Sequence, residues 1–263
     1  MRKLPVYGVL SHALRSVIDH LRFAWHVSWP WLLITIPLSL LLETTLPPID
    51  PEAKDAVALA RNAQVGSTYM LMGLASMLVF SSIAVNWHRY ILKDELPIGR
   101  ARLRLDGVVW RYFGNTLLVI LIVLAACVPI VILLSLLTGV SGLGIGAAST
   151  LTMALTGLIA IPLSYRLMVK LPAIAVGNDS FKFKMAMEKT AGNSLQLCIA
   201  GVFILVTALL IGLAIGYAST LAGGGAGYVV ASVVQQIVSW IVTIYTVTYL
   251  TSLYGFFVEG RDF

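Results

Sequence analysis

The sequence predicts an all-α, polytopic membrane protein with six transmembrane helices and interfacial amphipathic helices. Hydrophobic residues make up 59% of the 263 and charged residues only 11%, whereas soluble domains carry about 25% charged residues. Apolar runs of the roughly 20 residues that cross a bilayer occur six times. A soluble protein of this size could not bury so much apolar surface, so lipid is the expected solvent for the whole chain, residues 1–263, as one integral membrane domain.

An amphipathic helix is predicted before the first apolar run, at residues 6–23. One helical face carries apolar residues and the other carries polar residues. The apolar face holds Leu10, Leu14, Val17, Ile18 and Leu21, and the polar face holds His12, Arg15, Ser16, Asp19 and Arg22. The segment is too polar to cross a membrane, so we expect it to lie in the interface.

The six apolar runs give the expected spans. The first begins among three tryptophans, which favour the membrane interface. A polar loop at 43–65 follows it, with a short helix expected at 52–63, and a second amphipathic patch is expected at 181–191. The expected spans are 25–42, 67–90, 115–137, 150–169, 194–218 and 229–257.

The Lys and Arg residues predict the orientation of these spans. All but Lys54 and Arg61 fall in the N-terminal segment, in the second-to-third and fourth-to-fifth connections, or in the C-terminal tail. By the positive-inside rule that side is cytoplasmic. We therefore expect a multi-pass protein of the bacterial inner (plasma) membrane with both termini in the cytoplasm, which requires an even number of spans.

The order of segments predicts an internal threefold repeat. Each unit consists of a basic amphipathic segment, a span, an outer turn and a second span. The proposed helical-hairpin units are residues 6–90, 99–170 and 180–257. The second and third units share a Gly-Asn-Ser/Thr-Leu step, at Gly114 and at Gly192. Such periods are typical of duplication, although any membrane protein built of hairpins alternates in a similar way.

This pattern resembles a known group of proteins. The basic segments before the odd-numbered spans, and the short entry Lys189-Thr190-Ala191-Gly192-Asn193, are similar to uncharacterised bacterial six-span families grouped near the membrane domain of glycerophosphoryl diester phosphodiesterases. The resemblance implies a membrane domain of this type. No segment of the sequence reads as the soluble phosphodiesterase domain, so the catalytic activity of that group is not expected here.

The sequence offers no catalytic constellation. The central parts of the third, fifth and sixth spans lack Asp, Glu, Lys, Arg and His, and such intramembrane charges are the usual marks of ion or proton pathways. There is no HExxH motif and no zinc-like cluster of Cys and His. We therefore expect no catalytic residue, no cofactor, no metal and no enzymatic activity. A membrane enzyme ranks behind a lipid-binding or scaffold protein and behind a small transporter.

The end of the second span carries the first candidate site. A contact with lipid headgroups or with a protein partner is one interpretation of Trp87, His88, Arg89, Arg100, Arg102 and Arg104. The alternative is that the aromatic residues anchor the helix at the headgroup layer and that the arginines only set its orientation.

The sixth span carries the second candidate site. Polar side chains facing lipid are costly, so at least one of the two glutamines should point inward. If the protein encloses a cavity, we expect it to be lined by Gln235, Gln236, Thr243 and Thr246. The threonines could instead bond to their own helix. A GxxxG motif at Gly212 and Gly216 predicts close helix packing, within the chain rather than between copies.

These observations favour a non-enzymatic membrane protein that interacts with lipid or acts as a scaffold for partners. The alternative is a small transporter or lipid-moving protein with a neutral cavity between the repeats. The expected partners are membrane lipids, through anionic headgroups on the cytoplasmic face, and a membrane protein or a second copy of the chain. Nucleic-acid binding is not expected, because no soluble domain carries a basic patch.

Overall fold

The computed structural model confirms the all-α polytopic fold. It describes residues 2–50, 52, 54–96, 103–140, 144–222 and 224–263. Throughout these residues the regular structure is helical, with no strand. Six of the helices are long and apolar enough to cross a membrane.

The helices follow one another with short connections. Their bounds are α1 (Val6–Asp19), α2 (Leu21–Thr45), α3 (Ala56–Lys93), α4 (Gly107–Val140), α5 (Ile145–Met168), α6 (Lys170–Ala175), α7 (Phe183–Lys189), α8 (Ser194–Ala222), α9 (Gly224–Tyr254) and a π-helical turn, η2 (Gly255–Glu259). The six spans are formed by α2, α3, α4, α5 with α6, α8, and α9 with η2.

Several spans begin earlier than the apolar runs predict, and carboxylates cap the two that extend farthest, α3 and α4. The Asp55 carboxylate accepts a hydrogen bond from the Ala58 N–H at 2.7 Å and starts α3 eleven residues before the expected span. The short helix expected at 52–63 is therefore largely part of α3. With 38 residues, α3 is about 57 Å long, which exceeds a hydrocarbon layer of about 30 Å. Asp106 caps α4 in the same way, through the N–H groups of Val108 and Val109.

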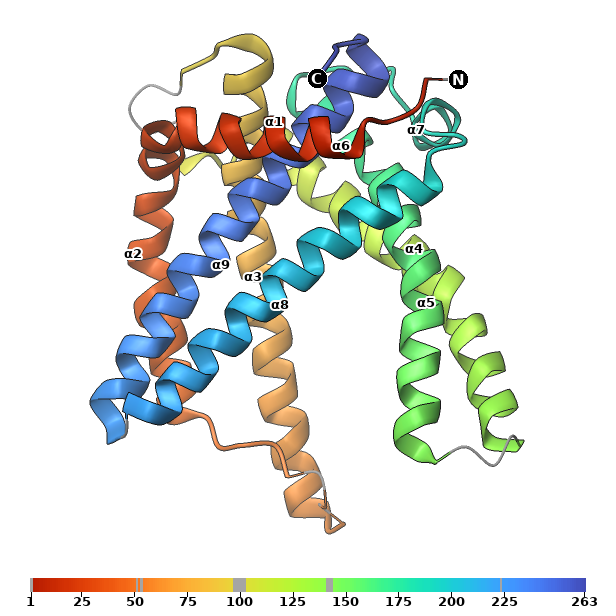
Figure 1. Ribbon diagram of the computed structural model, residues 1–263. Coiled ribbons are helices and arrows are strands. Elements are labelled where there is room, and N and C mark those ends of the chain that lie inside the picture. The colour runs from red at the N-terminus through yellow and green to blue at the C-terminus, as the bar shows by residue number, and fades with distance from the viewer. Residues whose placement is uncertain (1, 51, 53, 97–102, 141–143, 223) are drawn as a thin grey trace.

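Both chain termini lie at one end of the bundle (Figure 1). The end of α3, the start of α4 and the segment from the end of α5 to the start of α8 lie at that end, and α1 runs across it. The opposite end holds the end of α2 and the start of α3, the end of α4 and the start of α5, and the end of α8 and the start of α9. Every described Lys and Arg except Lys54 and Arg61 belongs to a segment at the end that holds the termini, which we call the basic end.

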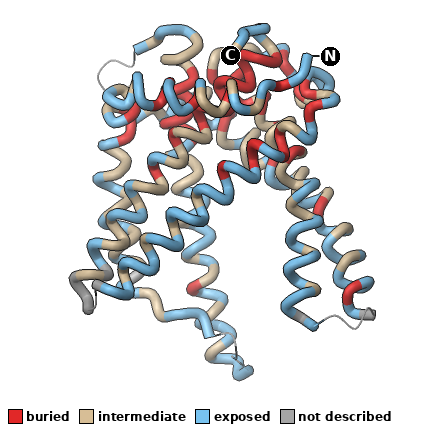
Figure 2. Tube along the Cα trace, in the orientation of Figure 1, coloured by how far each residue is buried: buried red, intermediate tan, exposed pale blue. Residues whose placement is uncertain are grey.

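Burial is concentrated at the basic end (Figure 2). One buried cluster joins α1, α8 and α9 around Val9, Leu197 and Tyr249. A second joins α2, α3, α6 and α9 around Trp87 and Leu171. The far halves of the spans are mostly exposed. Lipid tails are as apolar as leucine, so the spans gain no hydrophobic free energy by covering those halves with protein.

The two glycine-asparagine steps that suggested a repeat have different local structures. Gly192 has a positive φ of 74° in the turn between α7 and α8, a conformation that glycine adopts without strain. Asn193 is buried and accepts a hydrogen bond from the Leu4 N–H at 2.8 Å. Gly114 and Asn115 lie inside the continuous helix α4. The detailed correspondence is therefore not seen, and the threefold duplication stays a prediction.

A close approach of two helices occurs at Gly201, not at the GxxxG motif. A Cβ at Gly201 would lie 2.3 Å from Ile161 Cγ2 and 2.6 Å from Tyr165 Cε2, so α8 packs tightly on α5 there. A Cβ at Gly212 or Gly216 would meet nothing within 4 Å. The prediction that the GxxxG motif packs within the chain was wrong.

We expect Gly201→Ala to destabilise the protein by about 1–3 kcal/mol, because an overpacked contact must shift backbone or side chains. Gly212→Ala is the matched control: it changes helix propensity equally but meets no neighbour. Thermal unfolding of the detergent-solubilised protein measures both. Equal stability of the two variants would contradict the packing described at Gly201.

Candidate functional site at the basic end

A buried histidine joins three spans at the basic end. His88 of α3 is fully buried. Its Nδ1 lies 2.8 Å from Thr251 Oγ1 of α9, and its Nε2 lies 3.2 Å from the Tyr112 hydroxyl of α4. Polar groups buried away from water are stable only when they are hydrogen-bonded, so these contacts fix the positions of α3, α4 and α9 relative to one another.

The partners of Thr251 assign the direction of each hydrogen bond. Its hydroxyl has one hydrogen, which it donates to the Val247 carbonyl oxygen at 2.9 Å. Thr251 Oγ1 therefore accepts from His88, and the proton of the neutral imidazole is on Nδ1. The unprotonated Nε2 then accepts from the Tyr112 hydroxyl. Hydrogen bonds are thus donated in one direction, from Tyr112 of α4 to His88 of α3 and from His88 to Thr251 of α9, and each of these side chains has its hydrogen-bond partners.

Trp87 lies beside His88 and is also fully buried. Phe23 of α2 packs near its ring, with centroids 6.0 Å apart, and Phe23 stacks on Tyr90 at 3.8 Å. The placement corrects the expected surface role of Trp87 and His88, since a headgroup cannot reach side chains with no exposed area. The local sequence is typical of an interfacial belt, but α2, α4, α6 and α9 cover this turn of α3.

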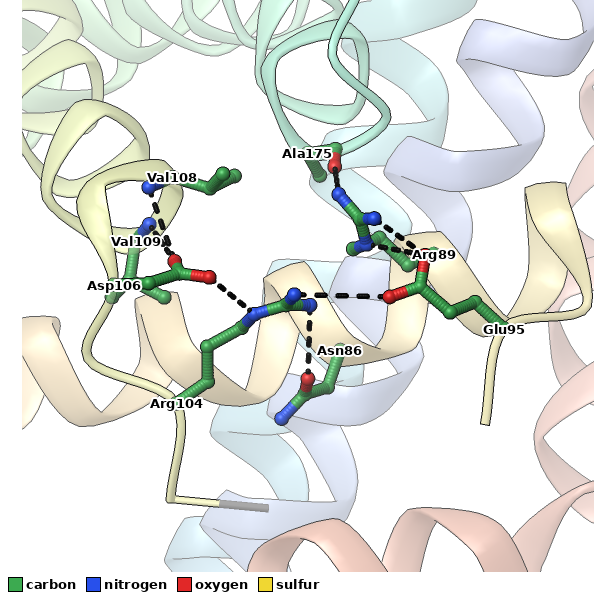
Figure 3. A network of polar contacts seen from close by, with 8 residues as sticks. All are labelled: Asn86, Arg89, Glu95, Arg104, Asp106, Val108, Val109 and Ala175. Atoms are coloured by element: carbon green, nitrogen blue, oxygen red, sulfur yellow. Dashed lines mark hydrogen bonds and ion pairs between the residues drawn. The ribbon is translucent and has the colours of Figure 1, made fainter. Parts of the chain in front are cut away.

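Arg89 and Arg104 belong to one polar network on the same end (Figure 3). Arg89 donates through Nε to Glu95 Oε2 at 2.8 Å and through Nη1 to the Ala175 carbonyl of α6 at 3.1 Å. Arg104 donates to Asp106 Oδ2 at 2.8 Å and lies 3.7 Å from the other oxygen of Glu95. The network thus ties the end of α3 to the start of α4 and to α6.

A backbone turn brings Glu95 to Arg89. Asp94 ends α3 in the left-handed conformation, with φ at 53°, which Asp tolerates better than most residues. The Glu95 N–H then donates back to the Arg89 carbonyl. Because the chain reverses there, the carboxylate of Glu95 faces both arginines (Figure 3).

These contacts favour the ionised carboxylates. The hydrogen bond from Arg89, followed by the charges of Arg89 and Arg104, lowers the pKa of Glu95 against the opposing effect of partial burial. Partial burial also acts against ionisation of Asp106. The Arg104 guanidinium and the N–H groups of Val109 and Val108 outweigh it, so the pKa of Asp106 is lowered.

The remaining arginines of the first candidate site have separate outcomes. Arg100 and Arg102 lie outside the described residues. The Arg104 side chain is 17% exposed and is held by two carboxylates. The structure therefore brings Arg89 and Arg104 together as parts of a helix junction, and any contact they make with headgroups stays a prediction.

The four residues of the second candidate site, on the sixth span, do not line one common cavity. Gln236 points inward, donates to Ser39 of α2 at 3.0 Å and lines a pocket of about 60 Å³ with Trp31 and Trp240. Gln235 is exposed, and its nearest polar partner is Ser239 of its own helix at 3.4 Å. Thr243 and Thr246 donate to carbonyls of α9 itself. Of the four residues, Gln236 is the one found lining that pocket.

Sequence reasoning missed the partners that make the junction. Asp106 carried a detectable signal, because an Asp just before a helix is a favoured N-cap. Tyr112 and Thr251 carried none, since their contact with His88 joins residues far apart in the sequence. Among the described residues, no group of three or more His, Cys, Asp or Glu side chains is placed to hold a metal ion.

The chain was compared with family models, with curated proteins and with solved structures. None of the three comparisons found a match.

Proposed function

We propose that this chain is a non-enzymatic, multi-pass protein of the bacterial inner membrane that binds anionic lipid and acts as a lipid-interacting or scaffold protein. In this proposal the basic end and both termini are cytoplasmic. The observation that carries the proposal is the segregation of charge in the fold: the basic end holds nearly all described Lys and Arg, and the far end holds Lys54 and Arg61. The positive-inside rule relates such segregation to orientation.

The position of α1 supports an interfacial basic end. Its inner side, with Val9 and Ala13, is fully buried against the spans. Its outer side exposes large apolar residues, with Tyr7 84%, Leu14 52% and Ile18 63% exposed. Arg15 lies on the exposed side as well. A helix that runs across the bundle end with outward apolar and basic residues is suited to the headgroup boundary.

The transport alternative has less support. The pocket at Gln236 has a volume of about 60 Å³, enough for about two waters, whereas ligand sites generally measure about 300–1,000 Å³. A larger groove of about 820 Å³ lies within the α4–α5 hairpin, lined by small and hydroxylated residues. It does not lie between the proposed repeats, where a carrier built from them would hold its substrate. A groove of about 430 Å³ does lie between α2 and α9, but its described lining is apolar and holds no charged, hydroxyl or amide side chain that would orient a substrate.

The proposal predicts a preference for anionic lipid. Each cation near an anionic surface contributes roughly 1 kcal/mol, so the detergent-purified protein should retain phosphatidylglycerol over phosphatidylcholine by at least roughly tenfold. Native mass spectrometry of the protein mixed with equal amounts of the two lipids measures this and also reports any second copy or co-purified partner. Equal retention of the two lipids would overturn the lipid-binding proposal.

The orientation has its own test. Green fluorescent protein fused after Phe263 should fluoresce, because that end is cytoplasmic in the proposal, and alkaline phosphatase fused there should be inactive. The same reporters placed in the α2–α3 connection, at Lys54, should give the opposite pair of results and serve as the control. An active phosphatase at Phe263 would contradict the orientation.

A further inference from the structure

A polar pocket at the basic end is separate from the His88 junction and from the network in Figure 3. It measures about 290 Å³ and lies between the start of α4, the start of α6 and the loop that leads to α7. The chemistry-bearing residues of its lining are Arg111, Asn115, Lys170, Asn178, Asp179 and Lys182.

The pocket collects positive charge. Arg111, Lys170 and Lys182 line it with one carboxylate, Asp179, which gives a formal net charge of +2. Asp179 is engaged by Arg111, whose Nη1 lies 2.9 Å from both carboxylate oxygens. Among the described residues, neither Lys170 nor Lys182 forms an ion pair. Because the Asp179 carboxylate is engaged by Arg111, the two ammonium groups repel each other across the pocket, and a bound anion relieves that repulsion.

Neighbouring side chains hold Lys170 in the pocket wall. Its Nζ donates to Asn115 Oδ1 at 2.7 Å and lies 4.0 Å from the centre of the Phe183 ring. Asn115 in turn donates to the Arg111 carbonyl one turn earlier in α4. These contacts leave part of the donor capacity of the ammonium group for a ligand, because it carries three N–H donors.

We propose that this pocket binds a phosphate group, and that the phosphate belongs to the headgroup of an anionic phospholipid. The inference rests on the proposed function and assigns a specific site to it. The pocket is formed where α4 and α6 meet at the basic end, and basic pockets between spans on the cytoplasmic side are suited to phosphorylated headgroups. Arg111 presents a planar donor fork for phosphate oxygens, and the two lysines supply point charges.

The test compares two pairs of lysines that carry equal charge. K170Q/K182Q removes two cations from the pocket. K184Q/K189Q removes two from α7 outside the pocket lining, where both side chains are exposed. Phosphatidylglycerol binding to the full chain is titrated by native mass spectrometry. We expect K170Q/K182Q to weaken binding by roughly tenfold or more and K184Q/K189Q to weaken it by less than about threefold.

A third variant guards against a folding defect, because its effect has the opposite sign. D179N raises the formal pocket charge and releases Arg111, so phosphatidylglycerol should bind roughly fivefold more tightly. Unchanged or weaker binding in D179N, or equal losses in the two lysine pairs, would overturn the pocket assignment. If the variants give one of these contradicting results but the unmodified protein still prefers phosphatidylglycerol, the assignment of the site to this pocket is wrong and the proposed function stands.

A final arm separates the two sources of phosphate. Inorganic phosphate is added in place of the lipid, and its binding is measured by calorimetry with the unmodified chain and K170Q/K182Q. If inorganic phosphate binds weakly or not at all while phosphatidylglycerol binds strongly, the result supports a lipid headgroup as the source of the phosphate. Inorganic phosphate that binds as tightly as phosphatidylglycerol, and is lost in K170Q/K182Q, would overturn the lipid assignment in favour of a soluble phosphate.

Discussion

The arrangement of the spans depends on the buried hydrogen bonds of His88. In a membrane, helices gain no hydrophobic free energy from packing on one another, so packing contacts and polar bonds between them decide their positions. His88 supplies two such bonds at once, to Tyr112 on α4 and to Thr251 on α9. Around it the aromatic residues of α2 and α3 and the Arg89 bond to α6 complete a packed junction. The far halves of the spans consist mostly of exposed residues (Figure 2).

The cations of the basic end therefore fall into two groups, those that bond to other parts of the protein and those that line a pocket. Arginines that lie deep in the junction, such as Arg89 and Arg104, are committed to carboxylates and carbonyls of the protein. Cations farther along the chain, such as Lys170 and Lys182, line a pocket and form no ion pair with any described residue. This division separates the charges that hold the fold from those proposed to bind lipid, although both groups count equally in the charge segregation behind the proposed orientation.

The sequence was sufficient for the spans and insufficient for the junction. Hydropathy is a local property, so six apolar runs predicted six spans. The predicted starts of α3 and α4 were too late in the sequence, because Asp55 and Asp106 cap these helices within polar sequence before the apolar runs. The Trp87-His88-Arg89 step was interpreted as a surface because its composition is typical of an interface. Its burial depends on contacts with residues up to 163 positions away, for which a single sequence carries no periodic signal. Likewise, GxxxG is a common packing motif, yet the tight contact formed at Gly201, which no motif marks.

A double-mutant cycle between His88 and Tyr112 tests the central claim most directly. The free energy of unfolding in detergent would be measured for the unmodified protein, His88→Ala, Tyr112→Phe and the double variant. If the hydrogen bond joins α3 to α4, the two substitutions are coupled by about 0.6 kcal/mol, the average for hydrogen bonds between membrane helices, and by no more than about 1.7 kcal/mol, the maximum. Fully additive losses, with a coupling energy near zero, would contradict the role of His88 as the contact on which the arrangement of spans depends.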